Sequence, residues 1–154
     1  MNKIIIMKVA FNALSAKAGA GISVFQILMP AISELDKENQ YYIVVSRNQP
    51  EIIKKIPDNF HKIVLNNVPN NPYFRVLYEQ IFLPFILFRY KIDLLYSVGN
   101  TTVLLAPTKI VLFIENPNPF TKIITNWSFK EKIRNKLLFY LTKLSAKRAN
   151  KIRF

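Results

Sequence analysis

The sequence predicts an α/β fold built on a doubly wound, mainly parallel sheet, and two observations carry this prediction. Strand-like apolar runs alternate with segments whose apolar residues recur at helical spacing. The first run is nearly continuous in its apolar content, as is typical of a parallel strand buried on both faces. A chain of 154 residues with 51% hydrophobic residues suits one domain with its own core. We therefore expect a single domain over residues 1–154.

The predicted strands are short runs rich in Ile, Val, Leu and Tyr. They cover Lys3–Phe11, Tyr41–Val45, Lys62–Leu65, Asp93–Ser97 and Ile110–Ile114. A further apolar segment begins at Lys151, and the chain ends inside it at Phe154. Because a self-contained fold rarely ends as an element opens, we expect the chain to be truncated before a second domain that the full activity requires.

Helical spacing appears in three long segments and one short one. They are Val24–Leu35 with Pro30 inside, Glu51–Ile56, Tyr73–Arg89 with Pro84 inside, and Phe129–Ala149. Each internal proline is expected to kink its helix, because it removes a backbone hydrogen bond. In the third helix the aromatic residues are Phe74, Tyr78, Phe82, Phe85 and Phe88. Aromatics at this spacing are more often core residues, so we expect a core role; the alternative is shallow contact with a bilayer.

The last predicted helix carries much of the charge of a chain whose formal net charge is +13. Ten Lys and Arg lie between Lys122 and Arg153, against the single acid Glu131. One interpretation is contact with an anionic membrane surface or another anion. The residues concerned are Lys130, Lys132, Arg134, Lys136, Lys143 and Lys147. The alternative is compositional bias, in which a solvated helix face simply accumulates lysine. A nucleic-acid partner is not expected, because no binding motif accompanies the charge.

Several classes of function are excluded by composition. The chain has no cysteine, which rules out disulfides, thiol catalysis and zinc–thiolate sites. Its only histidine, His61, lacks a second imidazole ligand, so no metal site is expected and His61 is interpreted as structural. No apolar run is long enough to span a bilayer, and the N-terminus lacks a signal-peptide cleavage pattern. We expect a cytoplasmic protein, with peripheral contact to the inner face of the membrane as an extension.

A small-residue loop after the first strand is the first candidate site. Gly19, Ala20 and Gly21 stand just before the first helix, where glycine allows a ligand to approach and free N–H groups suit a phosphate. The segment does not match G-x-G-x-x-G, because Val24 occupies the third glycine position. A flexible connection without a ligand is the alternative interpretation.

The second candidate is the carboxyl edge of the sheet, where open α/β sheets bind ligands. The glycine loop should meet there with Gly99, Asn100 and Thr101 and with Glu115 and Asn116. Glu115 directly follows an apolar strand, which favours an acid of raised pKa or an acceptor for sugar hydroxyls. Its alternative role is to cap a helix or to pair with a lysine.

Several segments, in this order, carry a resemblance to a known family. They are the glycine loop, Tyr78-Glu79-Gln80-Ile81-Phe82-Leu83-Pro84, the strand Lys91–Ser97 with its turn, the strand Ile110–Ile114 with its Asn-Pro loop, and Lys147–Ile152. Together they are similar to the N-terminal domain of family 4 glycosyltransferases of the GT-B fold, and Glu79 to Pro84 resembles the E-Q-x-x-L-P helix of these enzymes. The resemblance covers essentially the whole chain.

The resemblance implies a Rossmann-like domain that holds the acceptor of a sugar-transfer reaction. Its implied substrates are a nucleotide-sugar and a lipid-linked or polysaccharide acceptor, with no cofactor and no metal. The glycine loop would approach the donor diphosphate, Glu115 would be catalytic, and Gly99, Asn100, Thr101 and Asn116 would line the acceptor cleft. The E-x7-E donor motif of the family's C-terminal domain is absent here, so this chain alone should be inactive. The alternative is a non-catalytic domain that binds a membrane or a partner subunit.

Overall fold

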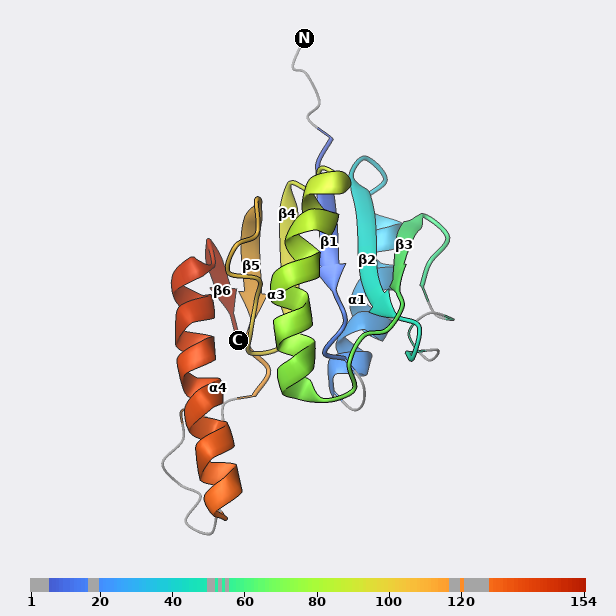
Figure 1. Ribbon diagram of the computed structural model, residues 1–154. Coiled ribbons are helices and arrows are strands. Elements are labelled where there is room, and N and C mark those ends of the chain that lie inside the picture. The colour runs from blue at the N-terminus through green and yellow to red at the C-terminus, as the bar shows by residue number, and fades with distance from the viewer. Residues whose placement is uncertain are drawn as a thin grey trace.

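The computed structural model describes residues 6–16, 20–49, 52, 54, 56–116, 120 and 128–154. Within these ranges six strands form one sheet in the order β3-β2-β1-β4-β5-β6, and every neighbouring pair is parallel (Figure 1). The elements are β1 (Lys8–Asn12), α1 (Ala20–Leu35), β2 (Gln40–Ser46), β3 (Phe60–Leu65), α3 (Pro72–Arg89), β4 (Leu94–Val98), β5 (Lys109–Phe113), α4 (Phe129–Arg148) and β6 (Lys151–Arg153). This strand order, which reverses direction beside β1, is that of a Rossmann-like fold.

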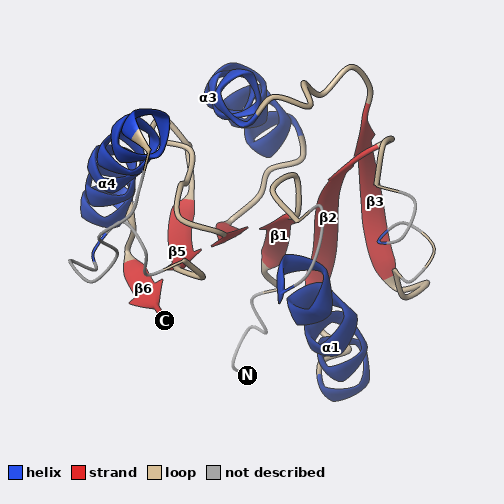
Figure 2. Ribbon diagram, turned by 90° about the horizontal axis from the view of Figure 1, so that it is seen from below, coloured by secondary structure: helices blue, strands red, loops and turns tan. Residues whose placement is uncertain are grey.

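Helices cover both faces of the sheet, which confirms the doubly wound arrangement. α1 lies on one face, and α3 and α4 lie on the other (Figure 2). Side chains alternate along each strand accordingly. On β1, Val9 and Phe11 belong to the core beneath α1, whereas Ala10 belongs to the core beneath α3.

The face beneath α1 is an aromatic core. Phe25 and Met29 of α1 are fully buried against the strands. The ring of Phe11 lies 6.4 Å from that of Phe25 in an edge-to-face arrangement and 5.4 Å from that of Tyr96. Burying a side chain of this size stabilises the fold by about 2 kcal/mol relative to leaving it in water. This helix is therefore held by conventional apolar packing.

α3 begins at a well-formed cap and buries only one of its sides. The Asn71 side chain accepts hydrogen bonds from the backbone N–H groups of Tyr73 and Phe74, and Pro72 takes the first helical position. The buried residues are Glu79, Leu83 and Leu87.

The expected core role of the α3 aromatics is wrong for most of them. The exposed fractions are 64% for Phe74, 47% for Phe82, 73% for Phe85 and 77% for Phe88, and only Tyr78 packs against the core. The reason is that the Leu83 side of the helix, not its aromatic side, faces the sheet. The spacing predicted the helix correctly and its orientation incorrectly.

α4 has an unusual distribution of polar and apolar residues. It begins with a capping box between Ser128 and Glu131. Its buried residues are the polar Asn135, Thr142 and Ser145. The predicted apolar stripe of this helix faces solvent instead, with exposed fractions between 43% and 78% for Phe129, Ile133, Leu137, Tyr140 and Leu144.

Some predicted boundaries differ from those observed. β1 starts at Lys8 rather than Lys3, and residues 1–5 lie outside the described ranges. The short helix expected over Glu51–Ile56 falls largely on residues outside them as well, and so do residues 117–119 of the Asn-Pro loop. Pro30 and Pro84 lie inside helices that continue on both sides of them. The segment at Lys151 is a sixth strand that pairs with β5.

Candidate functional site

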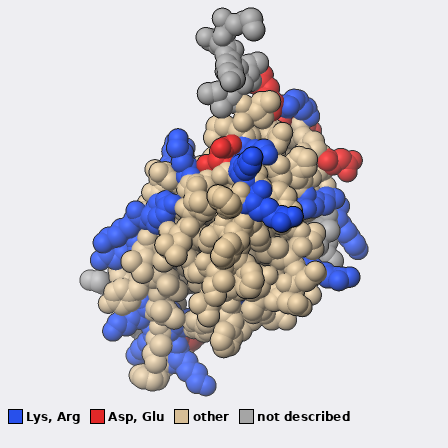
Figure 3. Space-filling model, turned by 45° about the horizontal axis from the view of Figure 1, so that its top comes forward, with Lys and Arg blue, Asp and Glu red and all other residues tan. Residues whose placement is uncertain are grey.

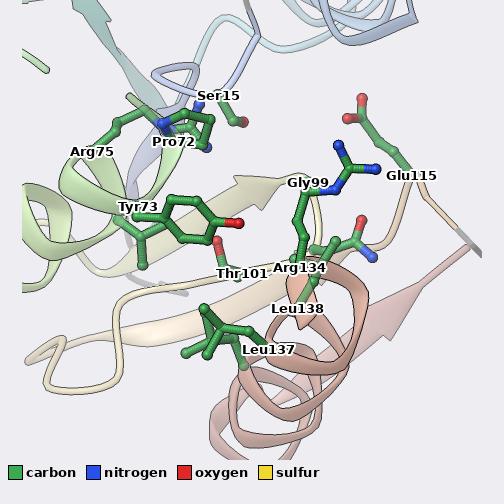
Figure 4. Close-up of a pocket in the computed structure, with 13 residues that line it drawn as sticks. Ser15, Pro72, Tyr73, Arg75, Gly99, Thr101, Glu115, Arg134, Leu137 and Leu138 are labelled. Atoms are coloured by element: carbon green, nitrogen blue, oxygen red, sulfur yellow. The ribbon is translucent and has the colours of Figure 1, made fainter. Parts of the chain in front are cut away.

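A cavity of about 280 Å³ lies at the carboxyl edge of the sheet, between α3 and α4 (Figure 4). One end is polar and is formed by the loops after β1, β4 and β5. The opposite wall is apolar and comes from the two helices. The lining residues are Ser15, Pro72, Tyr73, Arg75, Val76, Gly99, Asn100, Thr101, Glu115, Arg134, Leu137, Leu138 and Leu141.

Gly99 allows the loops after β1 and β4 to approach each other at the polar end. Its φ of +109° lies in a region that other residues rarely adopt. A Cβ added there would stand only 3.2 Å from the Ser15 hydroxyl. That hydroxyl donates a 2.7 Å hydrogen bond to the Val98 carbonyl. Both conformation and space therefore require glycine at this position.

Asn100 and Asn116 form a clamp that joins the loops after β4 and β5. The Asn100 amide nitrogen donates to the Asn116 carbonyl at 2.7 Å, and the Asn116 backbone N–H donates back to the Asn100 oxygen at 3.0 Å. The Asn100 side chain is thus occupied in positioning the loop that carries Glu115. Both residues were expected to line a cleft, and the structure places only Asn100 in the cavity wall.

Glu115 brings a carboxyl group to the polar end of the cavity. Its Oε1 atom is buried and has no hydrogen-bond partner in the described part of the chain. Burial raises the pKa of its carboxyl group above the ordinary value. A Cβ added to Gly21 would lie at an ordinary contact distance of 3.6 Å from Oε1, so the first turn of α1 stands beside the carboxyl group. Neither a capping role nor an ion pair with lysine is found for Glu115 among the described residues.

The glycine loop is described only in part. Gly19 lies outside the described residues, whereas Ala20 and Gly21 form the first turn of α1. Gly21 packs against Ala16, where an added Cβ would approach the Ala16 Cα to 3.2 Å. The N-terminus of α1 therefore lies next to the Glu115 carboxyl group. The sheet brings these two predicted sites together.

A buried polar network fixes α3 against the end of β1. The Glu79 carboxylate accepts hydrogen bonds from the Asn12 amide and from the Arg75 guanidinium, both at 3.0 Å. Burial raises the pKa of Glu79, while Arg75 and Asn12 act in the opposite direction. Because Arg75 also lines the cavity, this network sets the position of one of its walls.

Gln80, the neighbour of Glu79, holds the loop that follows β4. Its amide nitrogen donates to the Thr102 carbonyl at 3.0 Å, and its oxygen accepts from the Leu104 N–H at 2.8 Å. The hydroxyl groups of Thr102 and Ser97 form a hydrogen bond of 2.6 Å. The Thr102 N–H donates to the Ser145 hydroxyl at 3.0 Å, which ties α4 to the same loop.

The predicted basic residues remain on the surface of α4. All six, from Lys130 to Lys147, are exposed, and Arg134 also lines the cavity, where it projects toward the polar end (Figure 4). The His61 ring lies 4.7 Å from the Tyr42 ring, tilted by 30° to it. In the described part of the chain, no group of three His, Asp or Glu residues could hold a metal ion.

Sequence reasoning missed most of the cavity wall, and three of the missed residues are polar groups that face the cavity: Ser15, Tyr73 and Arg134. Ser15 lies three residues beyond β1, and the rule that ligands bind beyond strand ends could have identified it. Tyr73 gave no such signal, because its helix was assigned to the core. Arg134 was counted only among the cations of α4, and nothing in the spacing of those cations distinguished it.

The sequence of this chain matches no protein-family model and no curated protein. In addition, none of the described helices combines the length and the apolarity needed to cross a bilayer. The fold is therefore shown by the structure itself, and the function is argued from the site.

Proposed function

We propose that this chain is the acceptor-side domain of a glycosyltransferase, which transfers a sugar from a nucleotide-sugar to a lipid-linked or polysaccharide acceptor. The observation that carries the proposal is the Glu115 carboxyl group at the polar end of a cavity, with a buried oxygen that has no hydrogen-bond partner among the described residues. Sugar transfer needs a group that accepts a hydrogen bond from the attacking hydroxyl. The similarity in element order to family 4 glycosyltransferases gives the reaction class.

In this proposal Glu115 orients the acceptor hydroxyl and accepts its proton. The hydroxyl oxygen bonds the anomeric carbon as the bond from that carbon to the diphosphate breaks, and the nucleoside diphosphate leaves. Only the ionised carboxylate can accept the proton. Because burial raises the pKa of Glu115, the rate should increase with pH until this group is ionised.

The remaining cavity residues would position the acceptor. Thr101 offers a hydroxyl at the polar end, and the Asn100–Asn116 clamp holds Glu115 in place. The N-terminus of α1, with Ala20 and Gly21, would face the donor diphosphate. Donor binding needs a second domain in this scheme, because catalysis requires donor and acceptor in near-attack geometry.

The test compares the chain alone with the chain joined to the donor-binding domain that the proposal requires. Both are incubated with radiolabelled nucleotide-sugars and membrane lipids of the source cells. The joined protein should transfer sugar, and Glu115→Gln should lower kcat/KM by about 100-fold or more and remove the rise of rate with pH. Glu34→Gln, on the exposed side of α1, is the matched control. Full transfer by the chain alone, or by Glu115→Gln, would refute the proposal.

The alternative is a domain that binds a membrane or a partner subunit without catalysis. The exposed apolar side of α3 is the observation that favours it. If the coding sequence downstream contains no second Rossmann-like pattern with E-x7-E, this alternative is preferred.

A further inference from the structure

The solvent side of α3 is apolar from one end to the other. Phe74, Leu77, Ile81, Phe85 and Phe88 are each between 49% and 77% exposed. They fall on one side of the helix at 100° per residue, opposite the buried Leu83 and Leu87. A helix that is apolar on its outer side as well as its inner one is normally covered by something.

α4 repeats this feature in a different form. The buried residues of its inner side are polar. This side holds loops through Ser145 and through Arg148, which donates to the Leu104 and Ala106 carbonyls. Its outer side carries the stripe of Phe129, Ile133 and Leu137 that continues through Tyr140 and Leu144.

Cations lie on both sides of the α4 stripe. At 100° per residue, Lys132, Lys136 and Lys143 lie along one side of it, and Lys130 and Arg134 lie along the other. An apolar centre between rows of Lys and Arg is the pattern of helices that lie in the interface of a membrane. The inner-side contacts keep the helix in this orientation.

The two outer sides form one surface. α3 and α4 lie on the same side of the sheet, and the face over α3 is nearly free of charged atoms and bordered by Lys and Arg (Figures 2 and 3). We define the outer face as the exposed apolar residues of α3 and α4 together with the cations that border them. We propose that the outer face docks on an anionic phospholipid bilayer.

Charge decides between a bilayer and a second copy of this chain. α4 carries seven Lys and Arg against one Glu. A two-fold dimer through the outer face would bring two such helices together, and like charges at close range repel. An anionic bilayer instead attracts these cations, while the aromatic residues enter the acyl boundary. The observations therefore favour the bilayer.

Docking would also bring the cavity to the bilayer. Tyr73 and Leu137 belong both to the apolar wall of the cavity and to the outer face. The cavity therefore opens where lipid would lie, with its polar end toward the sheet. An acceptor anchored by a lipid tail can reach Glu115 in this arrangement. This consequence rests on the proposed function, whereas the docking proposal does not rest on it.

The experiment measures sedimentation of the full chain with sucrose-loaded vesicles. One set is phosphatidylcholine alone, and the other contains one third phosphatidylglycerol. Wild type should bind the anionic vesicles at least about tenfold more tightly than the neutral ones, and added salt should weaken this binding. The triple variant Lys132→Gln, Lys136→Gln, Lys143→Gln should lose about tenfold or more in affinity for anionic vesicles.

Two matched variants complete the test. The control Lys37→Gln, Lys54→Gln, Lys62→Gln removes the same charge at exposed positions outside the outer face, and it should bind within about twofold of wild type, since cations away from the lipid surface contribute little. Phe85→Ser with Phe88→Ser should release the protein from anionic vesicles without altering its circular dichroism.

Three outcomes would overturn the proposal. They are equal losses in the two lysine variants, equal binding to neutral and anionic vesicles, and a wild-type dimer that ignores vesicles and becomes monomeric with Phe85→Ser and Phe88→Ser. The last outcome would assign the outer face to a second copy. None of these outcomes depends on sugar transfer, so docking and the proposed function can fail separately.

Discussion

The two sides of the sheet are built on different principles. α1 covers one side with the buried Phe25 and Met29, and its exposed apolar residues, such as Ile27 and Leu35, stand apart from one another. On the other side, α3 and α4 turn much of their apolar surface outward, and the residues of α4 that are fully buried are all polar. The side beneath α1 is therefore held mainly by apolar packing, whereas the other depends heavily on buried hydrogen bonds.

This difference shows what buried polar groups do in the fold. Glu79, Gln80 and Ser145 each hold a segment distant in the sequence at the carboxyl edge of the sheet. Such groups are costly to leave unpaired, so their hydrogen bonds favour the observed orientation of each helix. The apolar side chains of α3 and α4 are thereby left on the outer face.

The largest expected effect contrasts phenylalanines on the two sides of the sheet. Phe25→Ala removes a fully buried ring, and Phe85→Ala removes one that is 73% exposed. The first should lower the free energy of unfolding by about 4 kcal/mol, and the second should change it by no more than about 0.5 kcal/mol. Urea denaturation of both variants measures the contrast. A similar loss in the two would show that Phe85 is buried in solution.

The next effect tests the network beneath α3. Glu79→Ala removes the acceptor of two hydrogen bonds and leaves the partly buried Arg75 unpaired. The expected loss of unfolding free energy is about 3 kcal/mol. Glu79→Gln keeps only one acceptor, so it should lose less. Glu38→Ala, at an exposed position, is the control. If Glu79→Ala unfolds like the control, the network does not hold the helix.

A smaller effect is expected where α4 contacts the loop after β4. Ser145→Ala leaves the buried N–H of Thr102 without its acceptor. The cost should be about 1–2 kcal/mol, also measured by urea denaturation. Ser33→Ala removes an exposed hydrogen bond to Asn59 and should cost much less. Equal costs would mean that water can take the place of the Ser145 hydroxyl as acceptor for the Thr102 N–H, and that the inner side of α4 is open to solvent.

The smallest effect concerns the acid in the cavity. Because burial raises the pKa of Glu115, its ionisation is less favourable in the folded state. The neutral carboxyl group therefore makes its full contribution to stability below the pKa of the unfolded chain, about 4.3. This contribution is lost as the pH rises through the higher pKa of the folded protein. Glu115→Gln should gain stability relative to wild type over that range. A difference that stays constant with pH would show that the carboxyl group is not desolvated.

The spacing of apolar residues along the sequence predicted most of the strands and helices, because that spacing differs between the two kinds of element. The rule that open α/β sheets bind ligands beyond their strand ends also predicts that Gly99 and Glu115 lie at one edge. The orientation of α3 and α4 could not be predicted, because it depends on partners distant in the sequence, such as Asn12 for Glu79 and Thr102 for Ser145. The use of the Asn100 amide as a clamp depends in the same way on Asn116. The roles of the cavity residues in sugar transfer stay predictions.

The contrast between the two sides is tested most directly by depth measurements with spin labels. The chain has no cysteine, so Phe88→Cys on α3 and Leu35→Cys on α1 each give one labelling site. With anionic vesicles, the label at position 88 should become accessible to oxygen and protected from an aqueous nickel chelate, while the label at position 35 stays in water. Labels that remain equally aqueous at both positions would contradict the assignment of the outer face to the bilayer.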